Sequence, residues 1–239
     1  MMDAWVDRIF GALGQAFDRD SAFTPILTAA QELDFEHCAY GMRLALPVSN
    51  PKTFMVNNYP EPWQRRYSDS GYLDIDPTAI HGRRSQTAIV WSDAVFQDAG
   101  QMWSEARSFD LKVGIAQSTF GSNGSVSMLT LSRSGTPFTP TELSKNGPYI
   151  RWLADLAHGA LSGTFLLGTD QDTPSLGLTV REIEILKWMA DGKTSNDTAG
   201  ILNLSVATVN FHMKNAISKL NAPNKTCAVA KALILGMLA

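Results

Sequence analysis

The stretch LTVREIEIL, residues 178–186, decides the fold of the C-terminal part of this chain. Within it, Thr179 and Glu182 are spaced as a capping box: the threonine hydroxyl accepts from a free backbone N–H, and the glutamate three residues later reaches back. Apolar residues then recur at the spacing of one helix face, at Ile183, Leu186 and Ala190. Because glycine tolerates the left-handed backbone that ends many helices, we expect this helix to end at Gly192.

Three further helices are predicted beyond Gly192. They are a short helix capped by Thr194 or Ser195 and ending at Leu202, a longer one over 206–220 capped by Ser205, and a last one over about 225–238. A short helix, a tight turn and a longer helix make up the helix-turn-helix, whose second helix enters the major groove of DNA. Periodicity alone leaves a generic helical bundle open as the alternative.

Polar side chains in this segment fall where DNA contacts are expected. If Val209 and Met213 face the core, Asn210 and Lys214 share another face, where asparagine can pair with adenine and lysine with guanine. Helix starts supply hydroxyls, amines and N–H groups that hold phosphates. The predicted DNA-binding residues are Lys193, Thr194, Ser205, Thr208, Asn210, His212, Lys214 and Lys225.

The preceding residues predict a mixed α+β domain. Helices are expected over 3–17, 21–33 with Ser21 as cap, 60–68, 99–109 and 140–164, with another start at Asp76-Pro77, and strands over 37–46, 53–58, 112–119 and 125–133. Strands joined in hairpins and separated from helices favour an N-terminal α-β-α sandwich with an antiparallel sheet. The polar stretch 166–177 reads as a linker, so the predicted domains are 1–165 and 178–239.

Composition narrows the class of protein. From residue 175 onward the chain has seven Lys/Arg and four Asp/Glu, or +3, and the rest has thirteen and nineteen, or −6, which together give the net charge of −3. A basic C-terminal segment on an acidic body suits DNA binding. Two distant cysteines predict no disulfide, and the N-terminus lacks the basic start of a signal peptide. We therefore expect a cytoplasmic protein without membrane contact.

Three motifs resemble the LuxR-type DNA-binding domain: residues 178–186, Gly192-Lys193-Thr194, and residues 208–215, which read TVNFHMKN. The resemblance covers about 60 residues and implies the helix-turn-helix. In that family Glu182, Leu186 and Gly192 hold the bundle together. Thr198-Ala199 departs from the usual apolar pair, and we expect the Thr198 hydroxyl to bond one turn back.

The N-terminal half resembles the autoinducer-binding domain of quorum-sensing LuxR receptors, which bind N-acyl-homoserine lactones. The resemblance spans roughly 20–160 and is carried by Tyr59-Pro60, Trp63, Tyr67, Asp76-Pro77, Trp91, Trp103 and Gly114. Many relatives have a proline near the position where this chain has Ala116-Gln117-Ser118. This difference leaves open which acyl chain the pocket prefers, and it does not change the expected class of ligand.

The resemblance implies a role for each residue of the pocket. The Trp63 indole would donate to the lactone carbonyl, Asp76 would accept the ligand N–H, and Tyr59 with Thr130 would donate to the acyl carbonyl. Residues around the lactone ring would be Trp91, Trp103, Ala106 and Leu111. Residues along the acyl chain would be Gly41, Tyr67, Thr78 and Leu129. Simpler readings stay open: Asp76 as only a helix cap, the tryptophans as plain core, and Thr130 facing either way.

The sequence therefore predicts a quorum-sensing transcriptional regulator rather than an enzyme. Its expected partners are an N-acyl-homoserine lactone as signal, double-stranded DNA with a two-fold symmetric site, a second copy of the chain and RNA polymerase, and no cofactor is expected. Three alternatives remain: a LuxR-type regulator of another small molecule or of none, a lactone-degrading enzyme, and a phosphorylation-driven regulator. Isolated histidines (His37, His81, His158 and His212) argue against a zinc lactonase, and the absence of βα alternation argues against a receiver domain.

Overall fold

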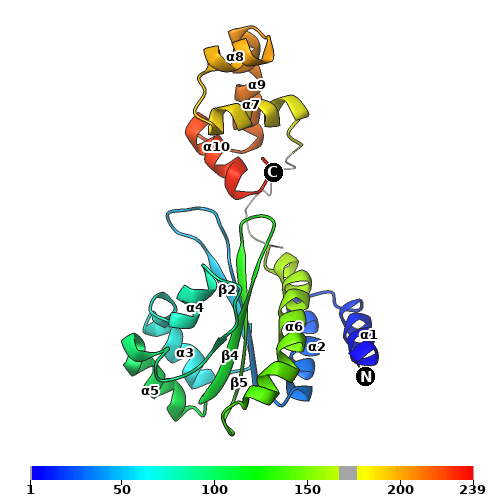
Figure 1. Ribbon diagram of the computed structural model, residues 1–239, viewed down its shortest axis with the longest axis vertical. Helices are drawn as coiled ribbons and strands as arrows, with labels where there is room; N and C mark the ends of the chain where they lie inside the picture. Colours follow the sequence, from blue (N-terminus) through cyan, green and yellow to red (C-terminus); the bar gives the residue numbers. More distant parts are fainter. Residues whose placement is uncertain (1, 167–176, 239) are drawn as a thin grey trace. The chain divides into compact units, whose positions relative to one another are not determined.

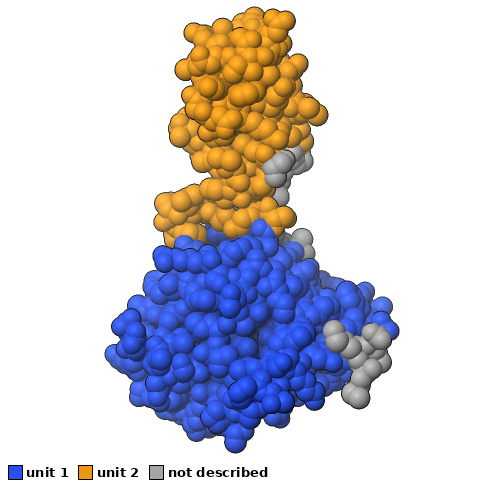
Figure 2. Space-filling view, viewed as in Figure 1, with its two compact units in different colours: residues 1–44, 52–121, 125–167 blue, residues 45–51, 122–124, 168–239 orange. Residues whose placement is uncertain are grey.

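The computed structural model describes residues 2–166 and 177–238. It divides into an α/β unit and a second unit, called the helical unit below, which contains the four C-terminal helices together with the loop residues 45–51 and 122–124 (Figures 1 and 2). The linker predicted over 166–177 lies outside the described residues except for its two ends, and Leu166 is the last residue of a helix. No helix in the two described ranges is long and apolar enough to cross a membrane.

A five-stranded antiparallel sheet forms the centre of the α/β unit, in the order β2-β1-β5-β4-β3. Its strands are β1 (His37–Arg43), β2 (Thr53–Asn57), β3 (Ile89–Val90), β4 (Val113–Phe120) and β5 (Val126–Arg133). The four longer strands were predicted within a few residues, whereas β3 was missed because two residues carry no alternation.

Helices cover both faces of this sheet (Figure 1). On one side lie α2 (Arg19–Glu32) and α6 (Pro140–Leu166), with α1 (Met2–Leu13) packed on α2; on the other lie α3 (Glu61–Asp69), α4 (Pro77–Gly82) and α5 (Gly100–Ser108), with short 3-10 turns at Tyr72–Asp74 (η1) and Gln97–Ala99 (η2). The predicted α-β-α sandwich with an antiparallel sheet is confirmed.

Local capping explains where these helices begin. Asp76 caps α4, as its position before Pro77 predicts. The cap of α2 is Asp18 rather than Ser21, which instead occupies the third helical position and returns a hydrogen bond to the cap. The prediction for Ser21 was therefore wrong by three residues, because both residue types make good caps.

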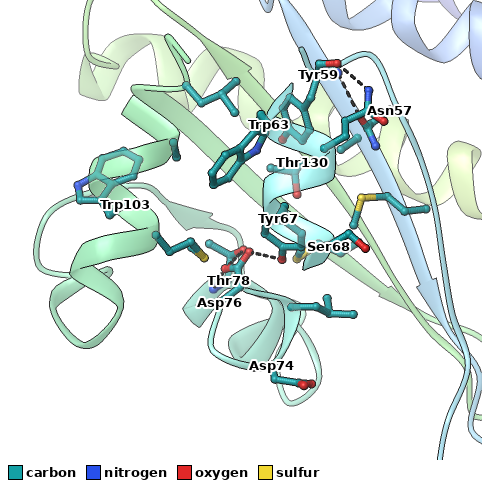
Figure 3. A pocket seen from close by; sticks show the side chains of 18 of the residues that line it. Asn57, Tyr59, Trp63, Tyr67, Ser68, Asp74, Asp76, Thr78, Trp103 and Thr130 are labelled. Carbon is teal, nitrogen blue, oxygen red and sulfur yellow. Dashed lines mark hydrogen bonds between the residues drawn. The ribbon is translucent and has the colours of Figure 1, made fainter. Parts of the chain in front are cut away.

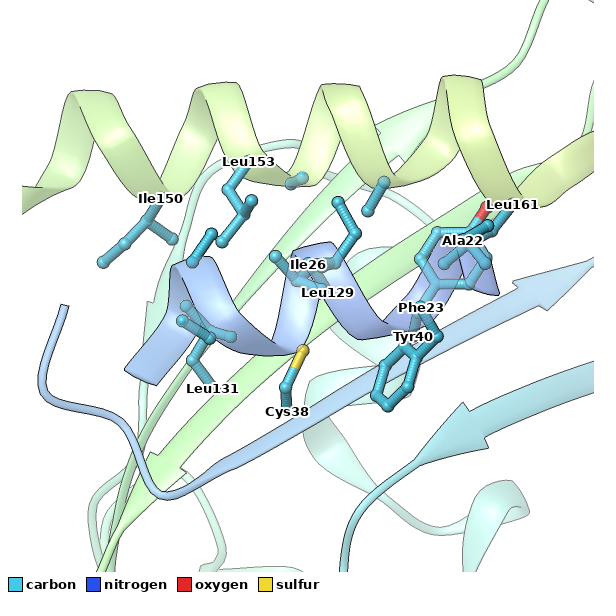
Figure 4. Packing of buried hydrophobic residues seen from close by; sticks show 14 of the residues in the cluster. Ala22, Phe23, Ile26, Cys38, Tyr40, Leu129, Leu131, Ile150, Leu153 and Leu161 are labelled. Carbon is cyan, nitrogen blue, oxygen red and sulfur yellow. The ribbon is translucent and has the colours of Figure 1, made fainter. Parts of the chain in front are cut away.

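The sheet face beneath α2 and α6 is filled with side chains (Figure 4). The Tyr40, Leu129 and Leu131 side chains project from the strands and are almost fully buried against Ile26 and Leu153. Close packing of this kind supplies most of the stability of a small unit. We infer that this face holds the α/β unit together.

The helical unit consists of α7 (Val180–Ala190), α8 (Ser195–Leu202), α9 (Val206–Lys219) and α10 (Lys225–Ile234). The Thr179–Glu182 capping box is present, and Thr194, not Ser195, caps α8. Gly192 has a φ of +81°, the left-handed conformation expected of it. The last helix ends earlier than predicted, before Gly236, whose φ is also positive.

One expectation about the core of this unit was wrong. Thr198 is fully buried, but its hydroxyl has no hydrogen-bond partner among the described residues. The expected bond to the backbone one turn back is not formed. The threonine therefore occupies an apolar position and leaves one buried polar group unpaired.

Candidate ligand pocket and nucleic-acid interface

A cavity of about 510 Å³ lies between the sheet and helices α3, α4 and α5 (Figure 3). Ten of the twelve residues predicted for ligand binding line it: Tyr59, Trp63, Tyr67, Asp76, Thr78, Trp91, Trp103, Ala106, Leu111 and Thr130. Further lining residues, which sequence reasoning did not select, include Met55, Asn57, Phe96, Met102 and Met128. The sheet therefore has one filled face and one hollow face.

Two predicted residues lie elsewhere. Gly41 lines a smaller cavity of about 70 Å³ that adjoins the first. Leu129 does not reach the pocket: it belongs to the core beneath α2 and α6. Successive side chains of a strand point to opposite faces, so Thr130 in the pocket requires Leu129 on the other side. The prediction for Leu129 was wrong for this reason.

Asp76 has two roles in the geometry of the pocket wall. Its Oδ1 accepts from the backbone N–H of Thr78 at 2.8 Å and from the Thr78 hydroxyl at 2.7 Å, which caps α4. Its Oδ2 accepts from the Tyr67 hydroxyl at 2.9 Å. Burial and the neighbouring Asp76 charge raise the pKa of Tyr67 well above its usual value. Tyr67 therefore stays neutral and keeps donating to the carboxylate, which retains lone pairs for a further donor.

Two of the predicted ligand donors, Trp63 and Thr130, are unpaired. The Trp63 side chain is 4% exposed, and neither its indole N–H nor the Thr130 hydroxyl bonds to any group in the described part of the chain. Burial raises the pKa of the Tyr59 phenol, which therefore remains a neutral donor. Unpaired donors beside a cavity are what a polar ligand requires.

Aromatic rings close the side of the cavity next to β4. Trp103 stacks on Phe96 with ring centroids 4.5 Å apart, and Trp91 meets both rings edge-on. Trp91 lies directly over Gly114, where an added Cβ would be 2.4 Å from the indole ring. The Trp103 N–H donates to Asp93 at 2.6 Å, so this indole offers its ring rather than its donor to the cavity.

A charged cluster joins the helices over the hollow face. Arg66 of α3 donates two hydrogen bonds to Glu105 of α5, at 2.6 and 2.7 Å, and Tyr72 of η1 donates a third at 2.8 Å. These bonds lower the pKa of Glu105 to about 2. Sequence reasoning missed the cluster because its members are 33 and 39 residues apart.

The exposed face of α9 carries the predicted base-reading residues. Asn210 and Lys214 are exposed, and the Asn210 side-chain oxygen accepts from the Ser195 hydroxyl at 2.9 Å, to which Lys225 also donates at 3.0 Å. This connects the starts of α8 and α10 to the middle of α9. Phe211, which sequence reasoning did not select, follows Asn210 on α9 and is 60% exposed.

The remaining predicted residues surround this face. Thr194 and Ser205 are helix caps, and the Ser205 hydroxyl also bonds to that of Thr208. His212 is half-buried beside the Phe211 ring. Lys193 is exposed.

Two protein-family profiles match the chain. The autoinducer binding domain matches residues 18–161, and the profile described as bacterial regulatory proteins, luxR family, matches residues 176–232. The chain belongs to the LuxR family. This LuxR-family chain is a quorum-sensing transcription regulator with an autoinducer-binding domain and a helix-turn-helix DNA-binding domain, and it is not an enzyme.

Known LuxR-family proteins resemble it over two thirds of its length or more. It is 39% identical to the transcriptional activator protein SolR of Ralstonia nicotianae over 96% of this chain and 97% of that one. The crystal structure of Escherichia coli SdiA superimposes with a TM-score of 0.83 at 30% identity, covering 100% of both chains, and SdiA has also been solved in complex with octanoyl-rac-glycerol. CepR2 of Burkholderia cenocepacia, described as N-acylhomoserine lactone dependent, has a TM-score of 0.64 at 30% identity, over 68% of this chain and 95% of that one.

The described residues of this LuxR-family chain form no candidate metal site. Over residues 2–166 and 177–238, no three or more His, Cys, Asp or Glu side chains gather where they could hold a metal ion. A lactonase of the zinc type would need such a group.

Proposed function

We propose that the cavity binds an N-acyl-homoserine lactone and that the chain then binds DNA as a homodimer. One observation carries the ligand proposal: the unpaired Trp63 indole N–H and the Asp76 carboxylate line the same largely apolar cavity of about 510 Å³. An acyl-homoserine lactone offers one N–H, two carbonyl acceptors and an apolar chain. Each of its polar groups left unpaired would cost about 1–3 kcal/mol.

In this proposal every polar group of the ligand has a partner. Trp63 donates to the lactone carbonyl, and the Asp76 Oδ2 accepts the ligand N–H beside Tyr67. The acyl carbonyl accepts from Tyr59 and Thr130. Lining residues are assigned by what they contact: Trp91, Trp103, Ala106 and Leu111 the lactone ring, and Gly41, Tyr67 and Thr78 the acyl chain. The lactone dependence of CepR2, whose sensor fold is similar, supports the ligand class.

A different ligand class has support from one observation. SdiA, with a similar fold, has been solved in complex with octanoyl-rac-glycerol, which has an acyl chain and hydroxyl groups but no amide N–H. A pocket that uses Asp76 to accept the amide N–H should prefer the lactone over the glycerol ester of equal chain length.

Thermal melting tests the ligand proposal. The protein is melted with octanoyl-homoserine lactone, octanoylglycerol or homoserine lactone lacking the acyl chain. A ligand present at 100 times its Kd stabilises the folded state by about 2.7 kcal/mol. We expect the acylated lactone to raise the melting temperature most, and Trp63→Phe to reduce that rise because it removes the N–H. No rise with any acyl-homoserine lactone would refute the proposal.

The DNA part of the proposal assigns roles to the exposed face of α9. Asn210 and Lys214 read base edges in the major groove, and Phe211 contacts a thymine methyl group. Phosphates are held by Lys193, Lys225, the helix caps Thr194 and Ser205, and Thr208 in the first turn of α9, with His212 one turn further along the helix. Lys193→Ala should weaken binding to all DNA sequences alike, whereas Asn210→Ala should reduce discrimination between sequences.

A homodimer should protect two half-sites related by a two-fold axis, about 10 base pairs apart. Footprinting checks this, and a footprint without dyad symmetry would contradict the dimer. We further propose that the protein acts in the cytoplasm and that the DNA-bound dimer contacts RNA polymerase, which co-purification on promoter DNA tests. The proposed domains are 1–165 and 178–239, joined by the linker 166–177, and limited proteolysis tests these limits.

A further inference from the structure

The cavity of about 70 Å³ beside the main pocket lies along the same face of the sheet. Both cavities share walls formed by Ala39, Met55, Tyr67, Met128 and Thr130. The smaller one adds residues further along the strands, among them Gly41, Arg43 and Val126. It is therefore a continuation of the pocket rather than a separate site.

The register of the strands explains how the two cavities meet. Gly41 of β1 is paired with Met55 of β2 on one side and with Met128 of β5 on the other. Side chains of a paired row point to the same face, so the row has a methionine at each side and no side chain in the middle. The missing side chain leaves a notch in the floor of the pocket at Gly41.

We propose that this notch admits the end of the acyl chain into the smaller cavity, so that the site favours acyl chains of about eight carbons. The inference rests on the proposed function, since it assumes an acyl-homoserine lactone whose acyl carbonyl lies at Thr130. It assigns Gly41, Met55 and Met128 as the residues that set chain length.

The chain length follows from the spacing along β5. Thr130 and Met128 are two residues apart, which is about 7 Å along a strand. An extended acyl chain advances roughly 1.3 Å per carbon, given bonds of about 1.5 Å, so about six carbons, the carbonyl included, reach the notch. Benzene, with six carbons, occupies an engineered cavity of roughly 150 Å³, so on the same scale the cavity of about 70 Å³ has room for about two or three further carbons.

Gly41→Val tests the proposal by filling the notch. An added Cβ at this glycine has only the Phe54 carbonyl oxygen within 4 Å, at 3.7 Å, so the sheet accepts it. Affinities of the butanoyl, hexanoyl, octanoyl and decanoyl lactones are measured by calorimetry for both proteins. In the unaltered protein each buried methylene should strengthen binding roughly fourfold, so octanoyl should exceed hexanoyl by roughly 15-fold.

In Gly41→Val, the affinities for the butanoyl and hexanoyl lactones should stay within about twofold of those of the unaltered protein. The increase in affinity from the hexanoyl to the octanoyl lactone should disappear. Gly159→Ala, on α6 with open space around its Cβ, is the control and should leave the whole series unchanged. Met128→Ala works in the opposite direction: it widens the notch and should move the preference towards decanoyl. This second variant keeps the test decisive if Gly41→Val does not fold.

The outcomes separate this inference from the proposed function. If no lactone of any length binds the unaltered protein, the lactone proposal itself is wrong. Suppose instead that lactones bind, but that Gly41→Val lowers the affinity for every chain length equally or for no chain length. The notch then does not receive the acyl chain, and the inference is overturned. If Met128→Ala leaves the preferred length unchanged, the same conclusion follows.

Discussion

The pocket of the α/β unit and helix α9 of the helical unit use aromatic side chains in opposite ways. Trp63 is 4% exposed and contacts three other rings, whereas Phe211 is 60% exposed and contacts one, that of His212. A buried ring stabilises its own unit, whereas an exposed ring contributes chiefly when a partner covers it. Recognition and stability should therefore be coupled in the pocket and separable on α9.

Truncating the two aromatic residues should produce the largest contrast. Trp63→Ala removes a buried ring and should lower the free energy of unfolding by about 3–5 kcal/mol. Phe211→Ala should change it by less than about 0.5 kcal/mol, as for other exposed positions. Urea unfolding followed by circular dichroism measures both. If the two variants lost similar amounts of unfolding free energy, the proposed difference between the buried and the exposed ring would be wrong.

Asp76→Asn should give the next largest effect, and it separates ligand binding from capping. Asparagine keeps one oxygen for the cap of α4 but offers an amide NH₂ where the Oδ2 accepts from Tyr67. Lactone affinity should fall about 10- to 100-fold, since the lost bond is to a charged group, while the melting temperature of the free protein changes less. Titration calorimetry measures the affinity.

Thr78→Val is the matched control for this variant. It removes only the hydroxyl that donates to the Asp76 Oδ1 and leaves the carboxylate in place. Its effect on lactone affinity should be smaller than that of Asp76→Asn. Unchanged affinity in Asp76→Asn would mean that the residue serves α4 alone.

A smaller effect is expected for Phe211 on DNA. Covering one methyl group is worth roughly a fourfold change in affinity, so replacing the contacted thymine by uracil should weaken binding by that factor. In Phe211→Ala the same replacement should have no effect, because the ring that covers the methyl is gone. Gel-shift titrations of the unaltered protein and Phe211→Ala on the thymine and uracil DNAs give the four affinities of a double-mutant cycle. Equal losses in the two proteins would exclude the contact.

The smallest effect concerns pH and the Arg66–Glu105–Tyr72 cluster. The pKa of Glu105 is lowered from 4.5 to about 2 by Arg66 and Tyr72. A lowered pKa adds stability above pH 4.5 that is lost as the pH falls towards 2. Glu105→Gln should therefore flatten the fall in the urea midpoint between about pH 5 and about pH 3. A slope equal to that of the unaltered protein would show that the cluster contributes nothing there.

Much of the fold was predictable from local signals. The capping box at Thr179, the proline after Asp76 and the turn Gly121-Ser122-Asn123-Gly124 between β4 and β5, where Gly124 has a φ of +71°, each specify the backbone within a few residues of themselves. Burial was harder to predict. Thr130 and Leu129 are neighbours, and only the pairing of β5 with β1 decides which of them faces the cavity.

The residues missed in the site share a dependence on distant parts of the chain. Glu105 joins the helices over the pocket only through its hydrogen bonds with Arg66 of α3 and Tyr72 of η1. The notch at Gly41 exists because two other strands place methionines beside it. Phe211 lies within the quoted motif, but its exposure depends on how α9 packs, which periodicity fixes only approximately.

The contact between Gly114 and Trp91 has a consequence for how this receptor can diversify. Every other amino acid adds a Cβ at position 114, and the indole ring carbons lie 2.4–2.6 Å from that point. Any single-nucleotide change of the codon that alters the amino acid would therefore displace the Trp91 ring from the cavity wall. Position 114 therefore couples the identity of one backbone residue to the position of an indole in the cavity wall, and in a saturation library the variants at 114 that still fold should show altered ligand choice.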